Sequence, residues 1–148
     1  MMKKMWLLGL MCCLPWTLSR AAEESPLSLE GTSWQLLEIQ DLGNSRFAPD
    51  SPAKYTVRFR SEGRLQVESD CNTGGATWQQ DGNTVEFVGL YSSEALCPPG
   101  SLHNRFMMHL HNVRSIVTRD GHLFLATSME GVLLQFEPLV FVPASRRQ

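Results

Sequence analysis

Ser69-Asp70-Cys71-Asn72-Thr73-Gly74-Gly75 is the stretch around which the rest of the chain is organised. Asp, Asn, Thr and Gly are turn formers, and the stretch follows the strand-like run 64–68, so we predict a tight reversal of the chain here. One plausible mate for its cysteine lies downstream, at Cys97. The remaining segments predict short strands and one helix arranged around these two cysteines.

The segment just before this stretch has the period of a half-buried strand pair. Tyr55, Val57 and Phe59 alternate with polar residues, the residues 61–63 supply a turn, and Leu65 and Val67 repeat the alternation. Such period-2 patterning predicts an antiparallel hairpin with one buried and one wet face. By similar patterns we predict further strands at residues 33–39, 76–80, 84–90, 115–118, 122–126 and 132–136.

The first of these strands is expected to place Trp34 and Leu36 on one face and Leu37 and Ile39 on the other. A loop is predicted at residues 41–53, which contain two glycine or asparagine turn signals and two prolines.

One helix is predicted over residues 102–113, with Ser101 as its cap. Leu102, Phe106, Leu110 and Val113 form a single apolar stripe along it. That stripe must cover something apolar, and an opening or edge of the sheet is the natural candidate. The helix histidines are expected to point away from the stripe, toward solvent.

Together these elements predict a mainly β (α+β) fold. We expect an antiparallel, half-open β-barrel of about seven or eight short strands with one α-helix that plugs or flanks it. Short, twisted strands joined by tight turns tend to close in this way because closure hides their edges.

The N-terminus has the features of a secretory signal peptide. Lys3 and Lys4 precede an apolar run over residues 5–14 that is short for a membrane span, and cleavage is expected after Ala21 or Ala22. A retained membrane anchor is the alternative. The expected organisation is a signal peptide at 1–21, a flexible lead at 22–30, one domain at 31–138 and a tail at 139–148.

Export sets the expected compartment and charge. Cys12 and Cys13 lie inside the apolar run, but Met11 stands where a lipoprotein signal has a small residue, so we expect no lipid anchor.

Removal of residues 1–21 takes away three basic residues and no acidic one, which leaves 10 Lys+Arg against 15 Asp+Glu, a net charge of −5. That charge argues against nucleic acid as a partner. The mature chain, with no second hydrophobic span, is expected to be soluble in the periplasm.

Several segments resemble a known family when taken in order. Gly31-Thr32-Ser33-Trp34-Gln35-Leu36, Asp70-Cys71-Asn72 followed by Gly74-Gly75, and Asp120-Gly121-His122-Leu123-Phe124-Leu125 resemble motifs of the META domain of HslJ-like heat-inducible proteins. The resemblance runs from about Leu29 to Glu137. It implies a small, mainly-β domain of bacterial envelope proteins that is linked to stress tolerance and has no established catalysis.

One residue and one segment depart from the family pattern. Asp70 stands where the family usually has glycine before Cys-Asn, and residues 92–97 differ from the family's Thr-x-Met-Ala-Cys-like segment. The second departure weakens the case that this loop keeps a contact specific to the family.

Cys71 and Cys97 have two possible roles. An even cysteine count in an exported chain predicts a disulfide. Closing the 27-residue loop between them would stabilise the fold by about 3–4 kcal/mol. The alternative is a thiol nucleophile that uses His103 or His109 as its base. No C-x-x-C spacing is present to lower a thiol pKa, so we favour the disulfide.

The other polar candidates are weaker. We expect Asp70 and Asn72 to satisfy backbone groups within the turn rather than to form a site. Met107, His109 and His111 suggest a metal site, but the two histidines lie about 200° apart around a helix. We therefore predict no metal site, no cofactor and no catalytic residues.

The sequence leaves three functions open. The favoured one is an exported, non-enzymatic domain that supports envelope maintenance or stress tolerance by binding an envelope protein or a small apolar molecule. The second is a carrier with a hollow barrel, in which Leu102, Phe106 and Leu110 would contact a lipid or hydrophobic ligand. The third is the thiol enzyme. Large aromatic side chains could line such a cavity or simply fill the core: Trp34, Phe59, Trp78, Phe87, Phe124 and Phe136.

Overall fold

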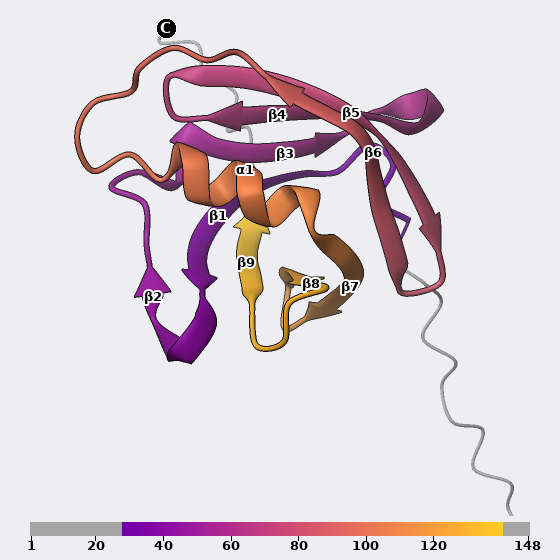
Figure 1. The fold of residues 1–148 in the computed structure, drawn as a ribbon. Coiled ribbons are helices and arrows are strands. Elements are labelled where there is room, and N and C mark those ends of the chain that lie inside the picture. Colours follow the sequence, from indigo (N-terminus) through magenta and orange to yellow (C-terminus); the bar gives the residue numbers. More distant parts are fainter. Residues whose placement is uncertain (1–27, 141–148) are drawn as a thin grey trace, which may run out of the picture.

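The computed structural model describes residues 28–140, so the predicted signal peptide and most of the predicted tail lie outside the described residues. Figure 1 shows antiparallel strands that wrap around one helix. The helix α1 spans His103–His111, and three short 3-10 turns lie at Leu42–Asn44, Pro52–Lys54 and Ser61–Gly63. The strands are β1 (Ser33–Gln40), β2 (Arg46–Phe47), β3 (Tyr55–Phe59), β4 (Arg64–Ser69), β5 (Asn72–Asp81), β6 (Thr84–Ser92), β7 (Val113–Arg119), β8 (His122–Thr127) and β9 (Leu133–Pro138).

The strands close into a barrel, which confirms the predicted fold class. Neighbours follow the order β2-β1-β3-β4-β5-β6-β7-β8-β9, and β9 returns to pair with β1. Every pairing is antiparallel. The two-residue strand β2, in the region predicted as a loop, adds a short edge beside Ile39 and Gln40. No helix within residues 28–140 is long and apolar enough to cross a membrane.

The barrel has one weak seam, between β6 and β7. Thr84 and Ser115 are the only residues paired across it in the ladder, and the Ile116 amide donates to the Asn83 carbonyl at 2.8 Å. In Figure 1, α1 lies across the mouth of the barrel, between the end of β6 and the start of β7 in the chain. The predicted role of the helix, to cover an opening of the sheet, is therefore confirmed.

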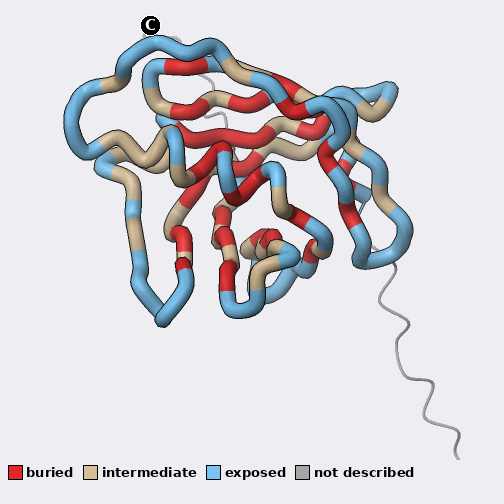
Figure 2. Tube along the Cα trace, in the orientation of Figure 1, coloured by how far each residue is buried: buried red, intermediate tan, exposed pale blue. Residues whose placement is uncertain are grey.

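The inward residues of β3 and β4 follow the predicted alternation, but Thr56, expected on the wet face of β3, is only 1% exposed. Tyr55, Val57, Phe59, Leu65 and Val67 all point inward and are at most 4% exposed. Figure 2 shows the buried positions along the strands and the helix, whereas the connecting loops are mostly exposed. Leu29 is also fully buried, so packed structure begins inside the segment predicted as a flexible lead.

One prediction about β1 is wrong. Ile39 was expected on the face opposite Trp34 and Leu36, but it is fully buried with them. The pairing of β1 with β9 shifts between Leu36 and Glu38, which marks a β-bulge. Because a bulge adds one residue to one strand, it reverses the facing of every residue that follows.

The helix buries a wider face than its apolar stripe. Phe106 and Leu110 face the core and have no solvent-accessible surface, as predicted. The Phe106 ring packs edge-on against Tyr55, at 5.6 Å between centroids, and lies 6.2 Å from Phe136. His109, however, is also completely buried, so the prediction that it faces solvent is wrong.

Candidate functional site

The central stretch forms a hairpin turn tighter than predicted. Ser69 pairs with Asn72, so only Asp70 and Cys71 lie between β4 and β5. Asp70 has a φ of 59°, in the left-handed region that favours glycine and tolerates aspartate. This conformation accounts for the glycine usual in the family at this position and for its replacement by Asp70 here.

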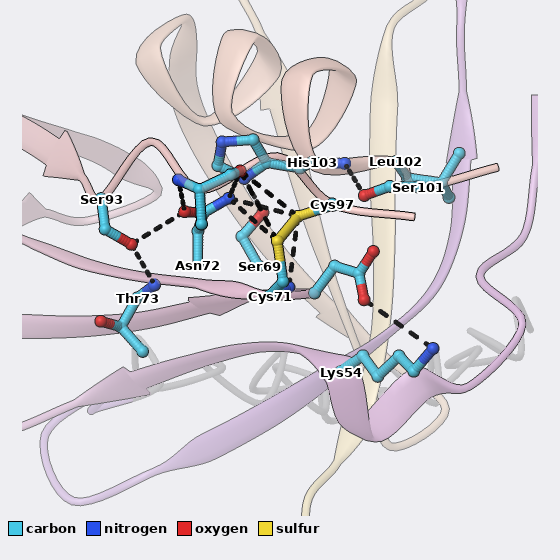
Figure 3. Close-up of a disulfide and its surroundings, with 12 residues drawn as sticks. Lys54, Ser69, Cys71, Asn72, Thr73, Ser93, Cys97, Ser101, Leu102 and His103 are labelled. Atoms are coloured by element: carbon cyan, nitrogen blue, oxygen red, sulfur yellow. Dashed lines mark hydrogen bonds and ion pairs between the residues drawn. A yellow bond between two sulfur atoms is a disulfide. The ribbon is translucent and has the colours of Figure 1, made fainter. Parts of the chain in front are cut away.

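Cys71 and Cys97 form a disulfide, with their Cα atoms 5.4 Å apart, which confirms the predicted pairing. Figure 3 shows the bond joining the β4–β5 turn to the loop that leads into α1. Because both sulfurs are in the disulfide, neither cysteine is a thiolate nucleophile in this structure.

Asn72 holds the same loop by hydrogen bonds. Its side-chain oxygen accepts from the Ala95 amide at 2.7 Å and from the Ser93 hydroxyl at 2.8 Å. Its side-chain NH₂ donates to the Ala95 carbonyl at 3.0 Å. Asn72 is 1% exposed, so these bonds satisfy a buried amide. We predicted bonds within the turn, but the partners are in a loop more than 20 residues away.

The loop anchored in this way covers residues 93–102 and contains no helix or strand. In Figure 1 it swings outward from the end of β6 before it enters α1. Leu96, one residue before the disulfide cysteine, is fully exposed. A shallow pocket of about 220 Å³ lies beside it, with Ala95, Cys97, Pro98 and His103 among its lining residues.

Two further hydrogen bonds fix the place where the loop becomes the helix. The Leu102 amide donates to the Tyr55 hydroxyl at 2.8 Å, and the Ser101 hydroxyl accepts from the His103 amide at 3.2 Å. The N-cap position is Leu102, which makes no side-chain capping bond, so the prediction of Ser101 as the cap is wrong by one residue. The Ser101 hydroxyl instead satisfies the first helical amide from outside the helix. The His103 Nδ1 and the buried Ser69 hydroxyl are 2.8 Å apart, which ties the helix to the end of β4.

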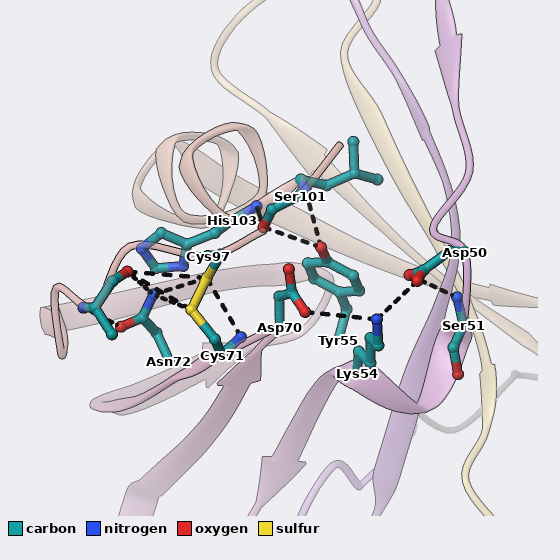
Figure 4. A network of polar contacts seen from close by, with 12 residues as sticks. Asp50, Ser51, Lys54, Tyr55, Asp70, Cys71, Asn72, Cys97, Ser101 and His103 are labelled. Atoms are coloured by element: carbon teal, nitrogen blue, oxygen red, sulfur yellow. Dashed lines mark hydrogen bonds and ion pairs between the residues drawn. A yellow bond between two sulfur atoms is a disulfide. The ribbon is translucent and has the colours of Figure 1, made fainter. Parts of the chain in front are cut away.

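An exposed ion-pair network lies on the other side of the turn (Figure 4). Lys54 contacts Asp50 at 2.7 Å and Asp70 at 3.8 Å. The hydrogen bond with Lys54 lowers the pKa of Asp50, and the same bond raises the pKa of Lys54. The Asp70 amide also donates to the Lys54 carbonyl at 2.7 Å. Asp70 is therefore a structural residue of the turn.

Gly74 allows β5 and β6 to approach each other closely. A Cβ atom at this position would lie 2.0 Å from the Tyr91 carbonyl oxygen, a distance that no side chain tolerates. The predicted motif residue is thus explained by packing between β5 and β6, next to the shift in their register.

A second polar cluster, which the sequence did not reveal, lies on the opposite side of the helix start. Arg105 forms an ion pair with Asp41, and its guanidinium lies 3.9 Å from the centre of the Phe47 ring. His109 Nε2 is 3.5 Å from Asp41 Oδ2, and neither ring nitrogen of His109 has a hydrogen-bond partner. Burial, together with the nearby Arg105 charge, lowers the pKa of His109.

The predicted ligand-contact residues occupy the packed interior. Phe106 and Leu110 fill space between helix and sheet, and Leu102 packs partly buried against the core. A ligand beneath the helix would have to displace these side chains. Of the predicted aromatic set, Phe124 alone lies outside this core; Arg119 stacks on it at 5.0 Å from the ring centre.

The described residues hold no obvious set of catalytic groups. Ser69 and His103 form a contact suited to a nucleophile and base, but Ser69 is completely buried. Within residues 28–140, no three His, Cys, Asp or Glu side chains gather in a way that could hold a metal ion. The arrangement is that of a covalently anchored, exposed loop on a solid barrel.

Comparison with known families gives a match to the META domain over residues 27–139. The chain belongs to the META domain family. The match covers the barrel and helix and begins before Gly31, in agreement with the burial of Leu29. No curated protein sequence matches this META protein.

Solved structures share the fold of this META protein at low sequence identity. An NMR structure of a protein from Burkholderia xenovorans has a TM-score of 0.64 and 18% identity, covering 87% of this chain and all of the other. A crystal structure of a DUF4847 family protein from Bacteroides vulgatus has a TM-score of 0.54 and 18% identity, covering 74% and 93% of the two chains. These similarities show a shared fold.

Proposed function

We propose that this META protein is an exported, non-enzymatic binding domain of the bacterial envelope, which contacts a partner protein through the loop 93–102. The observation that carries the proposal is the exposed Leu96 on a loop fixed by a disulfide and by Asn72. Surface loops held in place by a rigid scaffold commonly carry binding residues. A fixed loop also loses less conformational entropy on binding than a free one.

Export is supported by two independent features. The sequence begins with a basic, then apolar, then small-residue pattern, and the two cysteines outside that segment are joined. Disulfides persist in the periplasm and are rare in the cytoplasm. A role in envelope maintenance or stress tolerance is implied by the family resemblance.

The absence of catalysis is proposed from chemistry at the candidate site. The two sulfurs are bonded to each other, and the Ser69 hydroxyl that contacts His103 is buried. A substrate would therefore meet a disulfide rather than a free thiol, and it could not reach the Ser69 hydroxyl without rearrangement of the turn.

Export can be tested by intact mass spectrometry of protein produced with its own N-terminus, alkylated before or after reduction. We expect a chain that begins near Ala22 and takes up alkylating reagent only after reduction. A mass that retains residues 1–21 would contradict export, and two alkylated cysteines without reduction would contradict the disulfide.

Partner binding can be tested by site-specific photo-crosslinking in cells. A photoreactive residue at Ala95 should give a discrete crosslinked protein, and Leu96→Asp should abolish that product. Val88→Asp is the matched control, because Val88 is an exposed apolar residue on β6 outside the loop. Equal loss with both variants, or no crosslinked product, would contradict the loop as the contact surface.

A further inference from the structure

A second concave surface lies on the outer face of β4, β5 and β6, away from the loop tip. It is a pocket of about 320 Å³ with Arg60, Arg64, Gln66 and Tyr91 among its lining residues. This volume is at the small end of the range for ligand pockets, about 300–1,000 Å³. Its three side-chain types, arginine, amide and phenol, all form hydrogen bonds with polar ligands.

The sheet register builds the pocket. Gln66 on β4 pairs with Gly75 on β5, and Gly75 pairs with Tyr91 on β6. Because Gly75 has no side chain, the Tyr91 ring lies over it; a Cβ atom there would be 3.1 Å from the Tyr91 hydroxyl oxygen. Tyr91 nevertheless stays 66% exposed, so one region of the phenol remains open to a ligand.

Arginines flank this aromatic side chain. Arg60 donates to the Gln66 side-chain oxygen at 3.1 Å, which fixes these two side chains relative to each other at the pocket. Arg64 is 68% exposed in its side chain and lies 3.9 Å from Glu62, a distance too long for a strong ion pair. The two arginines bring positive charge to this pocket, partly offset by Glu62, in a chain that is acidic as a whole once its signal is removed.

We propose that this pocket, which we call the Arg64–Tyr91 pocket, binds an acidic sugar: a glycan ring that carries a carboxylate. Arginine guanidinium groups match a carboxylate with paired hydrogen bonds. The exposed phenol offers an apolar surface for the C–H face of a sugar ring and a hydroxyl at its edge. The negative charge of Glu62, 3.9 Å from Arg64, makes a singly charged carboxylate a better fit than a doubly charged phosphate.

The expectation of a cell-envelope glycan rests on the export proposed above, whereas the preference for a carboxylate rests on the pocket alone. The export proposal and the sugar-binding proposal can fail separately. Sugar binding is measured on purified protein, whereas export is measured by the mass of the mature chain.

The test uses two sugars that share a ring and differ in one carboxylate-bearing group, N-acetylmuramic acid and N-acetylglucosamine. Each is titrated into the ¹⁵N-labelled mature chain and followed by NMR. We expect saturable shifts of the Gln66, Gly75 and Tyr91 amides with the acidic sugar, and binding at least tenfold weaker for the neutral one, because charge-assisted hydrogen bonds are lost.

Matched variants sharpen the result. Arg64→Gln should weaken binding of the acidic sugar by about tenfold or more, and Arg46→Gln should leave it unchanged. Arg46 is a fair control because its side chain is 64% exposed, close to the value for Arg64, and lies on β2. Tyr91→Ala should also weaken binding, while Tyr91→Phe should retain the ring contribution.

Three results would overturn the proposal. The first is the absence of saturable shifts with the acidic sugar, and the second is an equal effect of Arg46→Gln and Arg64→Gln. The third is a response of the same size to acetate or to phosphatidylglycerol vesicles, which would show that the pocket recognises anions in general or a lipid surface rather than a sugar.

Discussion

The helix α1 carries two histidines in opposite situations. His103, at the start of the helix, is 2.8 Å from the Ser69 hydroxyl and lies beside a loop fixed by a disulfide. His109, further along, is completely buried with no hydrogen bond to either ring nitrogen. Buried polar groups cost free energy when they lack partners. Contacts at the start of the helix therefore stabilise the fold, whereas the buried His109 ring, which has no hydrogen bond, destabilises it.

The largest effect is expected from removal of the disulfide. The double variant Cys71→Ser/Cys97→Ser should lower the free energy of unfolding by about 3–4 kcal/mol, because the unfolded chain regains the entropy of the closed loop. Urea unfolding followed by tryptophan fluorescence measures this change. Reduced wild-type protein should lose a similar amount. A change below about 1 kcal/mol would mean that the helix start is not anchored by the disulfide.

The next effect concerns the hydrogen bonds that hold the loop. Asn72→Ala in the oxidised protein should cost about 2–3 kcal/mol, because three bonds to the loop are removed from a buried side chain. The Ala95 amide should then exchange with solvent faster, as measured by hydrogen exchange. Thr73→Ala, at the adjacent exposed position, is the control. Unchanged exchange at Ala95 would contradict this role for Asn72.

A smaller effect is expected at the partnered histidine. His103→Leu should cost about 1–2 kcal/mol, because the buried Ser69 hydroxyl loses its partner. A double-mutant cycle with Ser69→Ala measures the interaction directly. The double variant should cost less than the sum of the single variants, and strict additivity would show that the contact contributes nothing.

The smallest effect, and of opposite sign, is expected at His109. His109→Leu should leave stability unchanged at pH 8 or raise it by about 1 kcal/mol, since an unpartnered polar group is replaced by an apolar one. Asp41 and Arg105 are the charged groups that face this ring. A stability loss as large as that of His103→Leu would erase the contrast between the two positions.

The same residue predicts how stability depends on pH. The pKa of His109 is lowered below its ordinary value of 6.5 by burial and by Arg105. Its neutral form therefore supports full stability above pH 6.5, and stability falls as pH drops toward the folded-state pKa. Urea unfolding at pH 8 and at pH 5 should show this loss in wild-type protein and in His103→Leu. His109→Leu should lose less stability between the two pH values.

Much of the barrel follows from local patterns in the sequence. Strict alternation correctly predicted the inward faces of β3 and β4, and the turn chemistry around Cys71 predicted the hairpin between β4 and β5. An even cysteine count outside the predicted signal segment predicted the disulfide. The predictions for the strands and the hairpin succeed because side-chain period and turn residues act through short-range rules.

The failures come from features set by distant parts of the chain. The bulge in β1 that turns Ile39 inward appears only in the pairing with β9. His109 flanks the apolar stripe, and it is buried because the helix sits in a barrel mouth that surrounds more of its circumference than a flat sheet would. Asn72 looked like an ordinary turn residue, since nothing nearby in the sequence marks Ala95 as its partner.

The closure between β1 and β9 also sets the order in which the protein can fold. Leu36 pairs with Phe136, so contacts that complete the barrel join residues about 100 positions apart. As the chain is synthesised from its N-terminus, one side of β1 must stay unpaired until β9 is available. Chains rich in such long-range pairs fold slowly. The disulfide lies in the middle of the chain, so it can form before β9 pairs with β1. It would then hold the central hairpin and the helix together until the barrel closes.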